Sequence, residues 1–256
     1  MAAPTTSLVG KVAIVTGSSR SIGAAVAKQL GLGGASVVVN YVSDAKAAEE
    51  VVSEIKGYNA GGSAIAVKAN AATVEGGQTL IDAAVQAFGK LDILVLSAGL
   101  MGSKPLNDTD EKFFDDHILS NVKAPLFTAK AASAILPSPG GRIIFFSSSL
   151  TGASAVLPNA LSYVASKGAI EQVSRVLAKD LGARGLTVNT VSPGPVDTTL
   201  FRAGKPEHVI KFIAGQNPNN RLGQPEDIAP TVAFLASPAA QWVNGQNIRV
   251  NGGFVV

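Results

Sequence analysis

Residues 11–23, KVAIVTGSSRSIG, join a short apolar run to a loop of small residues and the start of an alanine-rich segment. The apolar run 11–16 predicts a buried strand, and residues 24–32 predict a helix. The first turn of such a helix offers unpaired backbone N–H groups and partial positive charge to an anion. Because this loop lies in the first strand–helix unit, its small residues favour a dinucleotide pyrophosphate site over an ordinary turn.

The remainder of the chain repeats this alternation of strand and helix. Further strands are predicted at 36–41, 63–69, 91–96, 142–146, 186–191 and 246–250, and the main helices at 45–58, 74–88, 110–136 with a kink at Pro125, 160–183, 207–215 and 224–235. Apolar strands separated by helices indicate a parallel sheet covered on both faces. With right-handed crossovers, this predicts one α/β domain over residues 1–256, a doubly wound parallel sheet (Rossmann fold) of about seven strands. Ligands bind outside the carboxyl ends of such strands, so the irregular region 197–224 is predicted to be a substrate lid.

Composition excludes several other classes of protein. The net charge is only +3 and no basic run is present, which argues against a nucleic-acid partner. There is no cysteine, so disulfides and thiol chemistry are excluded. No apolar run reaches the roughly 18 residues of a membrane span, and residues 1–8 lack signal-peptide features, so we expect a soluble cytoplasmic protein. His117 and His208 are expected at the surface, and without a cluster of histidines and carboxylates we predict no catalytic metal.

A second informative stretch runs from Ser147 to Lys167. Tyr163 and Lys167 are four residues apart in a segment that predicts a helix, so both side chains lie on one face. A nearby ammonium favours the phenolate and is expected to lower the tyrosine pKa from about 10. The pair is therefore a candidate general acid/base near neutral pH, although the same spacing occurs by chance in many surface helices.

The end of the second predicted strand bears on the choice of dinucleotide. Many NAD sites place a carboxylate there for the ribose hydroxyls, but this chain has Asn40 followed by Tyr41 and Ser43. Without that carboxylate a 2′-phosphate is not repelled, and Arg20 in the phosphate loop is a candidate bidentate partner for it. We therefore predict NADP(H) in preference to NAD(H).

Four motifs in order along the chain resemble those of the short-chain dehydrogenase/reductase family, classical branch, over nearly its whole length. Thr16–Gly23 resembles the family's cofactor loop, Leu96–Gly99 its N-N-A-G segment, Tyr163-x-x-x-Lys167 its catalytic pair and Asn189–Gly194 its N-x-V-x-P-G segment. Two departures are noted. Ser21 replaces the middle glycine of the loop, and Leu96-Ser97 replaces two asparagines.

The resemblance implies roles for further residues. The family serine precedes a glycine by three positions, so Gly152 points to Ser149, with Ser148 as the alternative. Asn121 corresponds to an asparagine that holds a water near the lysine, and Thr198 and Val196 to groups that contact the nicotinamide carboxamide. The implied catalytic residues are Ser149, Tyr163, Lys167 and Asn121. The implied cofactor-binding residues are Gly17, Ser19, Arg20, Ser21, Ile22, Asn40, Tyr41, Ser43, Asn70, Ala71, Ser97, Ala98, Gly99, Tyr163, Lys167, Pro193, Gly194, Val196 and Thr198.

The expected activity is reversible reduction of a ketone to a secondary alcohol with NADPH, with Tyr163 as the general acid. Candidate pocket residues are apolar and favour a hydrophobic small-molecule ketone: Met101, Leu150, Val156, Leu157, Leu161, Leu200, Phe201 and Phe212. A 3-oxoacyl-carrier-protein substrate is the main alternative, and a non-catalytic dinucleotide sensor or scaffold is the alternative outside enzymes. Relatives are usually homotetramers, so a tetramer is expected, with a dimer as the alternative.

Overall fold

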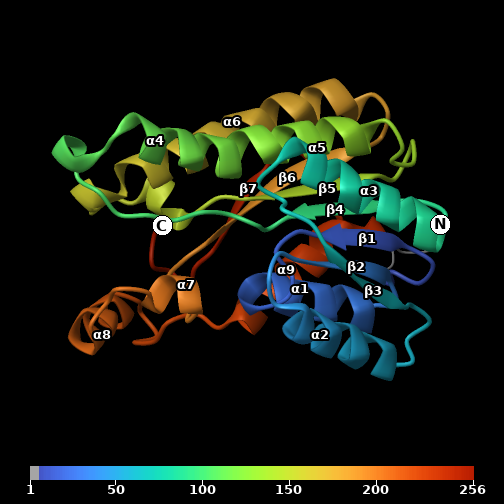
Figure 1. Cartoon of the computed structure of the whole chain (residues 1–256), viewed down its shortest axis with the longest axis horizontal. Helices are drawn as coiled ribbons and strands as arrows, with labels where there is room; N and C mark the ends of the chain where they lie inside the picture. The colour runs from blue at the N-terminus through green and yellow to red at the C-terminus, as the bar shows by residue number, and fades with distance from the viewer. Residues whose placement is uncertain (1–5) are drawn as a thin grey trace.

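The fold is a seven-stranded parallel sheet in the order β3-β2-β1-β4-β5-β6-β7 (Figure 1), seen in a computed structural model that describes residues 6–256. The strands are β1 (Val12–Val15), β2 (Ser36–Tyr41), β3 (Ala64–Lys68), β4 (Ile93–Leu96), β5 (Arg142–Phe146), β6 (Thr187–Pro193) and β7 (Asn247–Val250). The chain builds outward from β1 to β3 and then crosses back to β4. Because the winding direction reverses between β1 and β4, a crevice opens at their carboxyl ends, where dinucleotides bind in such sheets. The doubly wound parallel sheet predicted from the sequence is confirmed.

Helices cover both faces of the sheet (Figure 1). One face packs against α1 (Ser21–Leu32), α2 (Ala45–Gly57) and α9 (Pro225–Ala236), and the other against α3 (Val74–Phe88), α5 (Ala124–Ser133) and α6 (Leu161–Gly182). Successive residues of β1 alternate between the two cores, with Ala13 and Val15 in the first and Val12 and Ile14 in the second. Both faces of the strand are buried, which explains its unbroken apolar sequence.

The single kinked helix predicted at 110–136 is three elements. α4 (Glu111–Ile118) passes into a π-helical turn, Leu119–Lys123, and α5 follows. Pro125 lies in the first turn of α5 and has no backbone N–H to donate, so the regular hydrogen-bond ladder is interrupted just before it. The irregularity is therefore centred on the widened turn that contains Asn121 rather than on Pro125, and such turns are frequent at functional sites.

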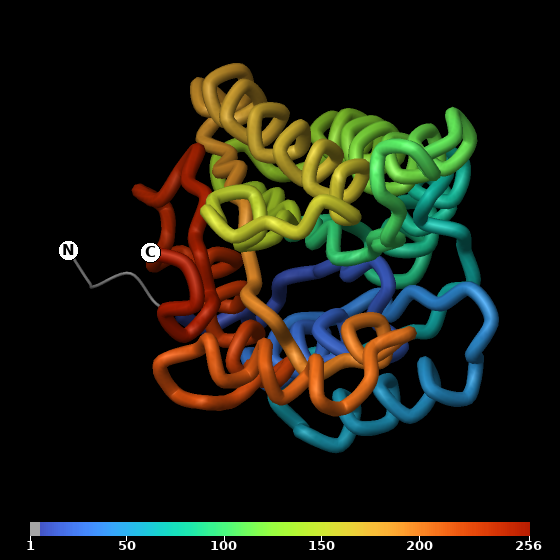
Figure 2. The backbone as a smooth tube through the Cα atoms, turned by 90° about the vertical axis from the view of Figure 1, so that its left-hand side faces the viewer, coloured from blue at the N-terminus to red at the C-terminus, as the bar shows by residue number. Residues whose placement is uncertain are grey.

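The predicted lid region, 197–224, contains the short helices α7 (Thr199–Arg202) and α8 (Glu207–Gly215). They stand apart from the helical layers at one end of the molecule (Figure 1), and Figure 2 views the molecule from that end. Val196 and Gly223 form an isolated parallel bridge that joins the two ends of the region. Within residues 6–256, no helix is both long and apolar enough to cross a membrane.

Candidate active site

The phosphate loop between β1 and α1 is closely packed. Gly17 has a φ of +64°, and a Cβ there would lie 3.1 Å from Ala98 Cα. A Cβ on Gly23 would lie 2.3 Å from the Gly17 carbonyl oxygen, so a side chain at either position would displace the loop. Arg20 is the N-cap residue of α1, is exposed, and has no ion-pair or side-chain hydrogen-bond partner in the described part of the chain. Its guanidinium is therefore available to a ligand.

Ser21 has a φ of +54°, in the left-handed region that favours glycine. It occupies the position where the family pattern has its middle glycine, so the loop keeps the backbone shape of a glycine while carrying a side chain. A non-glycine residue in this region costs about 1–2 kcal/mol. The sequence departure thus imposes local strain at the start of α1.

The Asn40 side chain is hydrogen-bonded within the protein. It is 1% exposed, its Oδ1 accepts the Gly17 N–H at 2.8 Å, and its Nδ2 donates to the Ala69 carbonyl at 2.9 Å. The side chain fastens the phosphate loop to the ends of β2 and β3, so its polar groups are not free for a ribose or phosphate. The direct contact of Asn40 with the cofactor stays a prediction, and its amide is already hydrogen-bonded within the protein.

A cavity of about 310 Å³ lies at the carboxyl ends of β1, β2 and β4. Predicted residues that line it are Gly17, Ser19, Arg20, Asn40, Tyr41, Ser43, Asn70, Ala71, Ala98 and Gly99. The sequence analysis missed Val42, Asp44, Ala72, Leu100 and Ser120. Most of these directly adjoin predicted residues, which is the signal that would have found them. Ser21, Ile22 and Ser97 do not line the cavity.

Asp44 places a carboxylate in this cavity after all. It is the N-cap of α2, and its Oδ1 accepts the Ala47 N–H at 3.0 Å. The cavity wall therefore carries one cation, Arg20, and one anion, Asp44. The carboxylate missing at position 40 is replaced by one on the following turn, a feature that the sequence analysis overlooked.

The end of β4 is held without the two asparagines of the family motif. Thr16 Oγ1 accepts the Ala98 N–H at 2.9 Å, and the Thr16 N–H donates to the Val95 carbonyl at 3.0 Å. A threonine at the end of β1 therefore fixes the Ser97–Gly99 turn.

Tyr163 and Lys167 lie on one face of α6, as predicted, with Lys167 Nζ 5.8 Å from the centre of the Tyr163 ring. Lys167 is buried and donates to the Phe146 carbonyl at 2.8 Å. Desolvation lowers its pKa to about 8. Burial also raises the pKa of Tyr163, and a hydrogen bond from Ser148 only partly opposes that rise.

The expectation that Lys167 makes Tyr163 more acidic is therefore wrong for the protein without cofactor. The desolvation of the phenolate outweighs the influence of a cation that is itself desolvated and turned toward a carbonyl. The phenol is consequently held in its protonated form at neutral pH.

The serine that hydrogen-bonds to the phenol is Ser148. Ser149 is 1% exposed, donates to the Ser192 carbonyl at 3.1 Å and accepts from Asn251 Nδ2 at 3.2 Å. Ser148 has an extended backbone, whereas Ser149 begins a 3₁₀ turn, Ser149–Gly152, so the two side chains leave the chain in different directions. Ser148, the predicted alternative, is therefore the serine whose hydroxyl acts on the Tyr163 phenol, and the catalytic role of Ser149 stays a prediction.

Glu171 holds the serine loop from α6. Its Oε1 accepts from Ser147 Oγ and from Thr151 Oγ1, each at 2.6 Å. These two hydroxyls flank Ser148 on either side. The sequence analysis did not identify Glu171, although its position one turn after Lys167 places it on the same helix face.

Asn121 and Lys167 converge on Gly99. A Cβ on Gly99 would lie 3.2 Å from Asn121 Oδ1 and 3.3 Å from Lys167 Nζ. The Asn121 amide is largely occupied, because Oδ1 accepts the Leu100 N–H and Nδ2 donates to the Leu100 carbonyl, both at 2.8 Å, and to Ser166 Oγ at 2.9 Å. The predicted catalytic lysine thus lies directly behind the wall of the cofactor cavity.

The segment after β6 closes the other side of the crevice. Pro193 ends β6, and Gly194 and Val196 line a second cavity of about 150 Å³. The bridge to Gly223 uses the Pro195 carbonyl and the Asp197 N–H, which leaves the backbone groups of Val196 outside it. Thr198 caps α7, its Oγ1 accepting the Phe201 N–H at 3.1 Å.

Several predicted substrate residues lie on exposed segments near the site. Leu157 and Phe212 are 62% and 67% exposed, and Val156, Leu161 and Leu200 are also exposed. They come from the loop before α6 and from the α7–α8 region, which lie at the same end of the molecule (Figures 1 and 2). These side chains are apolar surface that a ligand could contact.

His117 is not at the surface. It is fully buried on α4, between Phe113 and Gly102. The prediction of a surface histidine is wrong because both ring nitrogens have backbone partners. In the described residues 6–256, no group of three histidines or carboxylates has the geometry of a metal site.

Fold and site together define a dinucleotide-binding oxidoreductase of the Rossmann class. Residues 17–255 match the family model described as enoyl-(acyl carrier protein) reductase. The chain belongs to the short-chain dehydrogenase/reductase family, as the sequence motifs indicated.

Relatives agree with this assignment and with the prediction of NADP(H). The chain is 41% identical to an NADPH-dependent aldehyde reductase-like protein of Arabidopsis thaliana, over 98% of this chain and 97% of the relative. It is 41% identical to a probable tetrahydroxynaphthalene reductase of Zymoseptoria tritici, over 97% and 96% of the two chains. The solved structure of a landomycin C-6 ketoreductase with bound NADP and rabelomycin is 37% identical, with a TM-score of 0.85 over 96% of this chain and 97% of the other.

Proposed function

We propose that the protein is an NADPH-dependent reductase of a hydrophobic ketone, with Tyr163 as the general acid. The observation that carries this proposal is the cluster of Ser148, Tyr163 and Lys167, whose ammonium lies behind Gly99 in the wall of the cofactor cavity. The residues fit NADP(H): the loop glycines let the backbone approach a pyrophosphate, and Arg20 is an unpaired cation at the cavity wall.

The mechanism assigns each residue one task. NADPH, when bound, supplies the hydride that reduces the carbonyl carbon. Ser148 donates a hydrogen bond to the carbonyl oxygen, and Tyr163 transfers its phenolic proton to that oxygen as negative charge develops on it. A raised tyrosine pKa suits this direction, since the phenol must be protonated before turnover. Lys167 supplies positive charge beside the phenolate that remains.

For the serine role, Ser148 replaces Ser149 because it is the serine that contacts the phenol. Asn121 joins the active site through the Leu100 backbone, and one lone pair of its Oδ1 remains for the water that the family resemblance implies.

The substrate class follows from the surface around the site. Exposed apolar side chains before α6 and on α7–α8 favour an aromatic or polycyclic ketone. The relative named as a probable tetrahydroxynaphthalene reductase and the landomycin C-6 ketoreductase with bound rabelomycin support this class. A 3-oxoacyl thioester of acyl carrier protein is the second candidate, and the description of the matching family model shares with it only the acyl-carrier-protein thioester, because an enoyl group is a C=C bond and not a ketone.

The test is NADPH and NADH oxidation with a panel of aromatic ketones, simple aldehydes and a 3-oxoacyl thioester. We expect turnover with NADPH and an aromatic ketone, and a loss of at least about a thousandfold in Tyr163→Phe, as for removal of a general acid with its oxyanion contact. Full activity of Tyr163→Phe would contradict the assignment. NADPH binding without turnover on any carbonyl would favour a sensor.

Assembly and location complete the proposal. We propose a homotetramer, with a dimer as the alternative, in the cytoplasm. Trp242 is 99% exposed, and Phe114, Phe127 and Phe234 are also exposed on α4, α5 and α9, which supports association through these surfaces. Light scattering of the purified protein measures the oligomeric state, and a monomer at micromolar concentration would contradict it.

A further inference from the structure

Residues 100–104, here called the strap, run from the wall of the cofactor cavity along α4. Leu100 lines the cavity and is held at both backbone groups by Asn121. Two residues further on, the Gly102 N–H donates to His117 Nε2 at 3.0 Å. Asn121 and His117 are one helical turn apart and therefore lie on the same helix face. From that face they hold Leu100 and Gly102, which are alternate residues of the strap.

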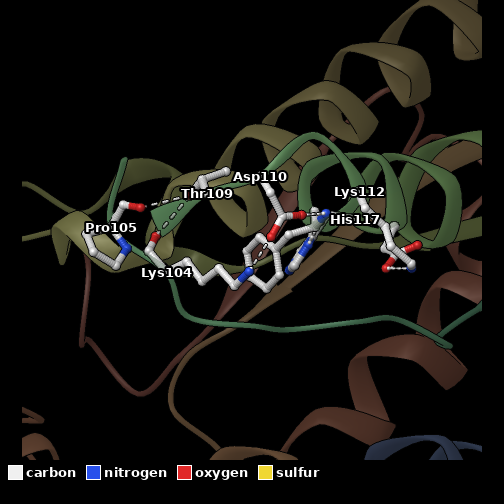
Figure 3. Close-up of polar contacts among 8 residues, drawn as sticks. Lys104, Pro105, Thr109, Asp110, Lys112 and His117 are labelled. Atoms are coloured by element: carbon white, nitrogen blue, oxygen red, sulfur yellow. Dashed lines mark hydrogen bonds and ion pairs between the residues drawn. The ribbon is translucent and has the colours of Figure 1, made fainter. Parts of the chain in front are cut away.

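The far end of the strap is fastened twice. Lys104 Nζ pairs with Asp110 at 2.6 Å and lies 4.7 Å from the centre of the Phe113 ring (Figure 3). The Lys104 N–H donates to the Asn159 carbonyl at 3.0 Å, on the turn that leads into α6 and Tyr163. The strap therefore connects the cofactor cavity, α4 and the loop before the predicted general acid.

His117 is the central fastener, and its protonation state follows from its partners. Nδ1 lies 2.7 Å from the Phe113 carbonyl, which can only accept, so Nδ1 carries the proton. Nε2 then has a free lone pair and accepts the Gly102 N–H. A neutral, fully buried imidazole with both nitrogens in use has a defined orientation.

The contact also requires the absence of a side chain at Gly102. A Cβ there would lie 2.6 Å from the Phe113 ring and 3.2 Å from His117 Cε1. The two rings are tilted by 55° with their centres 4.5 Å apart, so neither can move aside without disrupting the other. The strap approaches α4 closely only because glycine faces this aromatic pair.

We propose that His117 is a positioning residue, whose neutral Nε2 fixes the strap beside the carbonyl-binding site. The inference rests on the proposed function, since the strap adjoins Asn121 and Lys167 through Leu100 and Gly99. His117 contacts neither Tyr163 nor the cavity wall itself, so it acts through the placement of the strap.

Two substitutions separate the nitrogens of the ring. In His117→Gln, the side-chain oxygen reaches the position of Nε2 and accepts the Gly102 N–H. In His117→Asn, the shorter amide reaches only the position of Nδ1, donates to the Phe113 carbonyl and leaves Gly102 unpaired. Lys104→Met is the control, because it removes the outer ion pair and leaves the His117 contact in place.

Hydrogen exchange and kinetics give independent results. We expect amide exchange in residues 100–104 to become about tenfold faster in His117→Asn, and the KM for the ketone to rise by a similar factor, because one buried hydrogen bond is lost. The KM for NADPH should change less than about twofold, as a contact outside the cofactor cavity contributes little to its affinity. His117→Gln should resemble the parent in both assays, and Lys104→Met should not alter exchange at Gly102.

Equal behaviour of the Gln and Asn variants, or unchanged exchange in His117→Asn, would overturn the proposal. Exchange is measured without substrate, so it tests the strap even if the proposed ketone reduction fails. Thermal melting of each variant shows whether the fold is retained. A KM effect in both variants with unchanged strap exchange would also count against a positioning role.

Discussion

Ser148 donates a hydrogen bond that lowers the pKa of the Tyr163 phenol, while the adjacent Ser149 is bonded to Ser192 and Asn251. Two consecutive hydroxyl groups thus have different roles: that of Ser148 contacts the phenol, and that of Ser149 links β6 to the C-terminal segment. The difference arises from the backbone, which changes from extended at Ser148 to 3₁₀-helical at Ser149.

Alanine substitutions at the two serines should therefore have different effects. Ser148→Ala removes the donor to the carbonyl oxygen and should lower kcat by about a hundredfold, as for loss of one oxyanion donor, with little change in stability. Ser149→Ala removes buried hydrogen bonds and should lower the free energy of unfolding by about 1–3 kcal/mol. Steady-state kinetics and urea unfolding of both variants check this. The reverse pattern would restore Ser149 as the active serine.

Lys167 should make stability depend on pH in a defined window. Its pKa in the folded protein, about 8, is below its ordinary value of 10.5. The folded state therefore binds fewer protons than the unfolded state between these values, and stability rises with pH there. The buried Lys167 ammonium lowers the free energy of unfolding fully below about pH 8, and this destabilisation is lost as the pH rises toward 10.5.

Comparison with Lys167→Met isolates this effect. The parent's free energy of unfolding should rise relative to that of the variant between pH 8 and 10.5, by up to a few kcal/mol, since one pKa unit corresponds to about 1.4 kcal/mol. Urea unfolding without cofactor, at about pH 7.5, 9 and 10.5, measures this difference in the free energy of unfolding. Parallel pH profiles for the two proteins would show that Lys167 is not desolvated.

Asp44 and Arg20 should have opposite effects on cofactor choice. Asp44→Ser keeps a capping side chain for α2 but removes the negative charge from the cavity wall. It should tighten NADPH binding about fivefold, the effect of about 1 kcal/mol of repulsion in a solvated site, and change NADH binding less.

The matched substitution is Arg20→Gln, which should weaken NADPH binding by about tenfold or more and leave NADH nearly unchanged, as expected for loss of a charge-assisted contact to phosphate. Fluorescence titration with both cofactors provides the measurement. If each variant changed the dissociation constants of NADPH and NADH equally, neither side chain would interact with the 2′-phosphate.

Ser21→Gly should stabilise the protein. The residue has a φ of +54°, which glycine adopts without steric cost, so relief of strain should raise the free energy of unfolding by about 1 kcal/mol. Ala is the control, because Ser21→Ala keeps the Cβ and should give no such gain. Thermal unfolding of both variants tests this, and a loss of stability in Ser21→Gly would show that the hydroxyl makes a compensating contact.

The sequence by itself determined the sheet and the position of its ligand crevice. Strands that are buried on both faces, such as Val12–Val15, have an unbroken apolar sequence that is recognised without any alternation of polar and apolar residues. The small residues of Thr16–Gly23 form a closely packed backbone turn. The four-residue spacing of Tyr163 and Lys167 also fixed their shared helix face, because helix geometry is local.

Which of several neighbouring polar groups face the crevice depends on how elements distant in the sequence pack together. Three predicted residues are buried against partners distant in the sequence. Asn40 bonds to Gly17 and Ala69, Ser149 to Asn251, and His117 to Gly102. The tyrosine pKa likewise depends on desolvation by the whole fold rather than on Lys167 alone. Hydrogen-bond satisfaction and burial are properties of packed elements, whereas strand and helix patterns are properties of the chain.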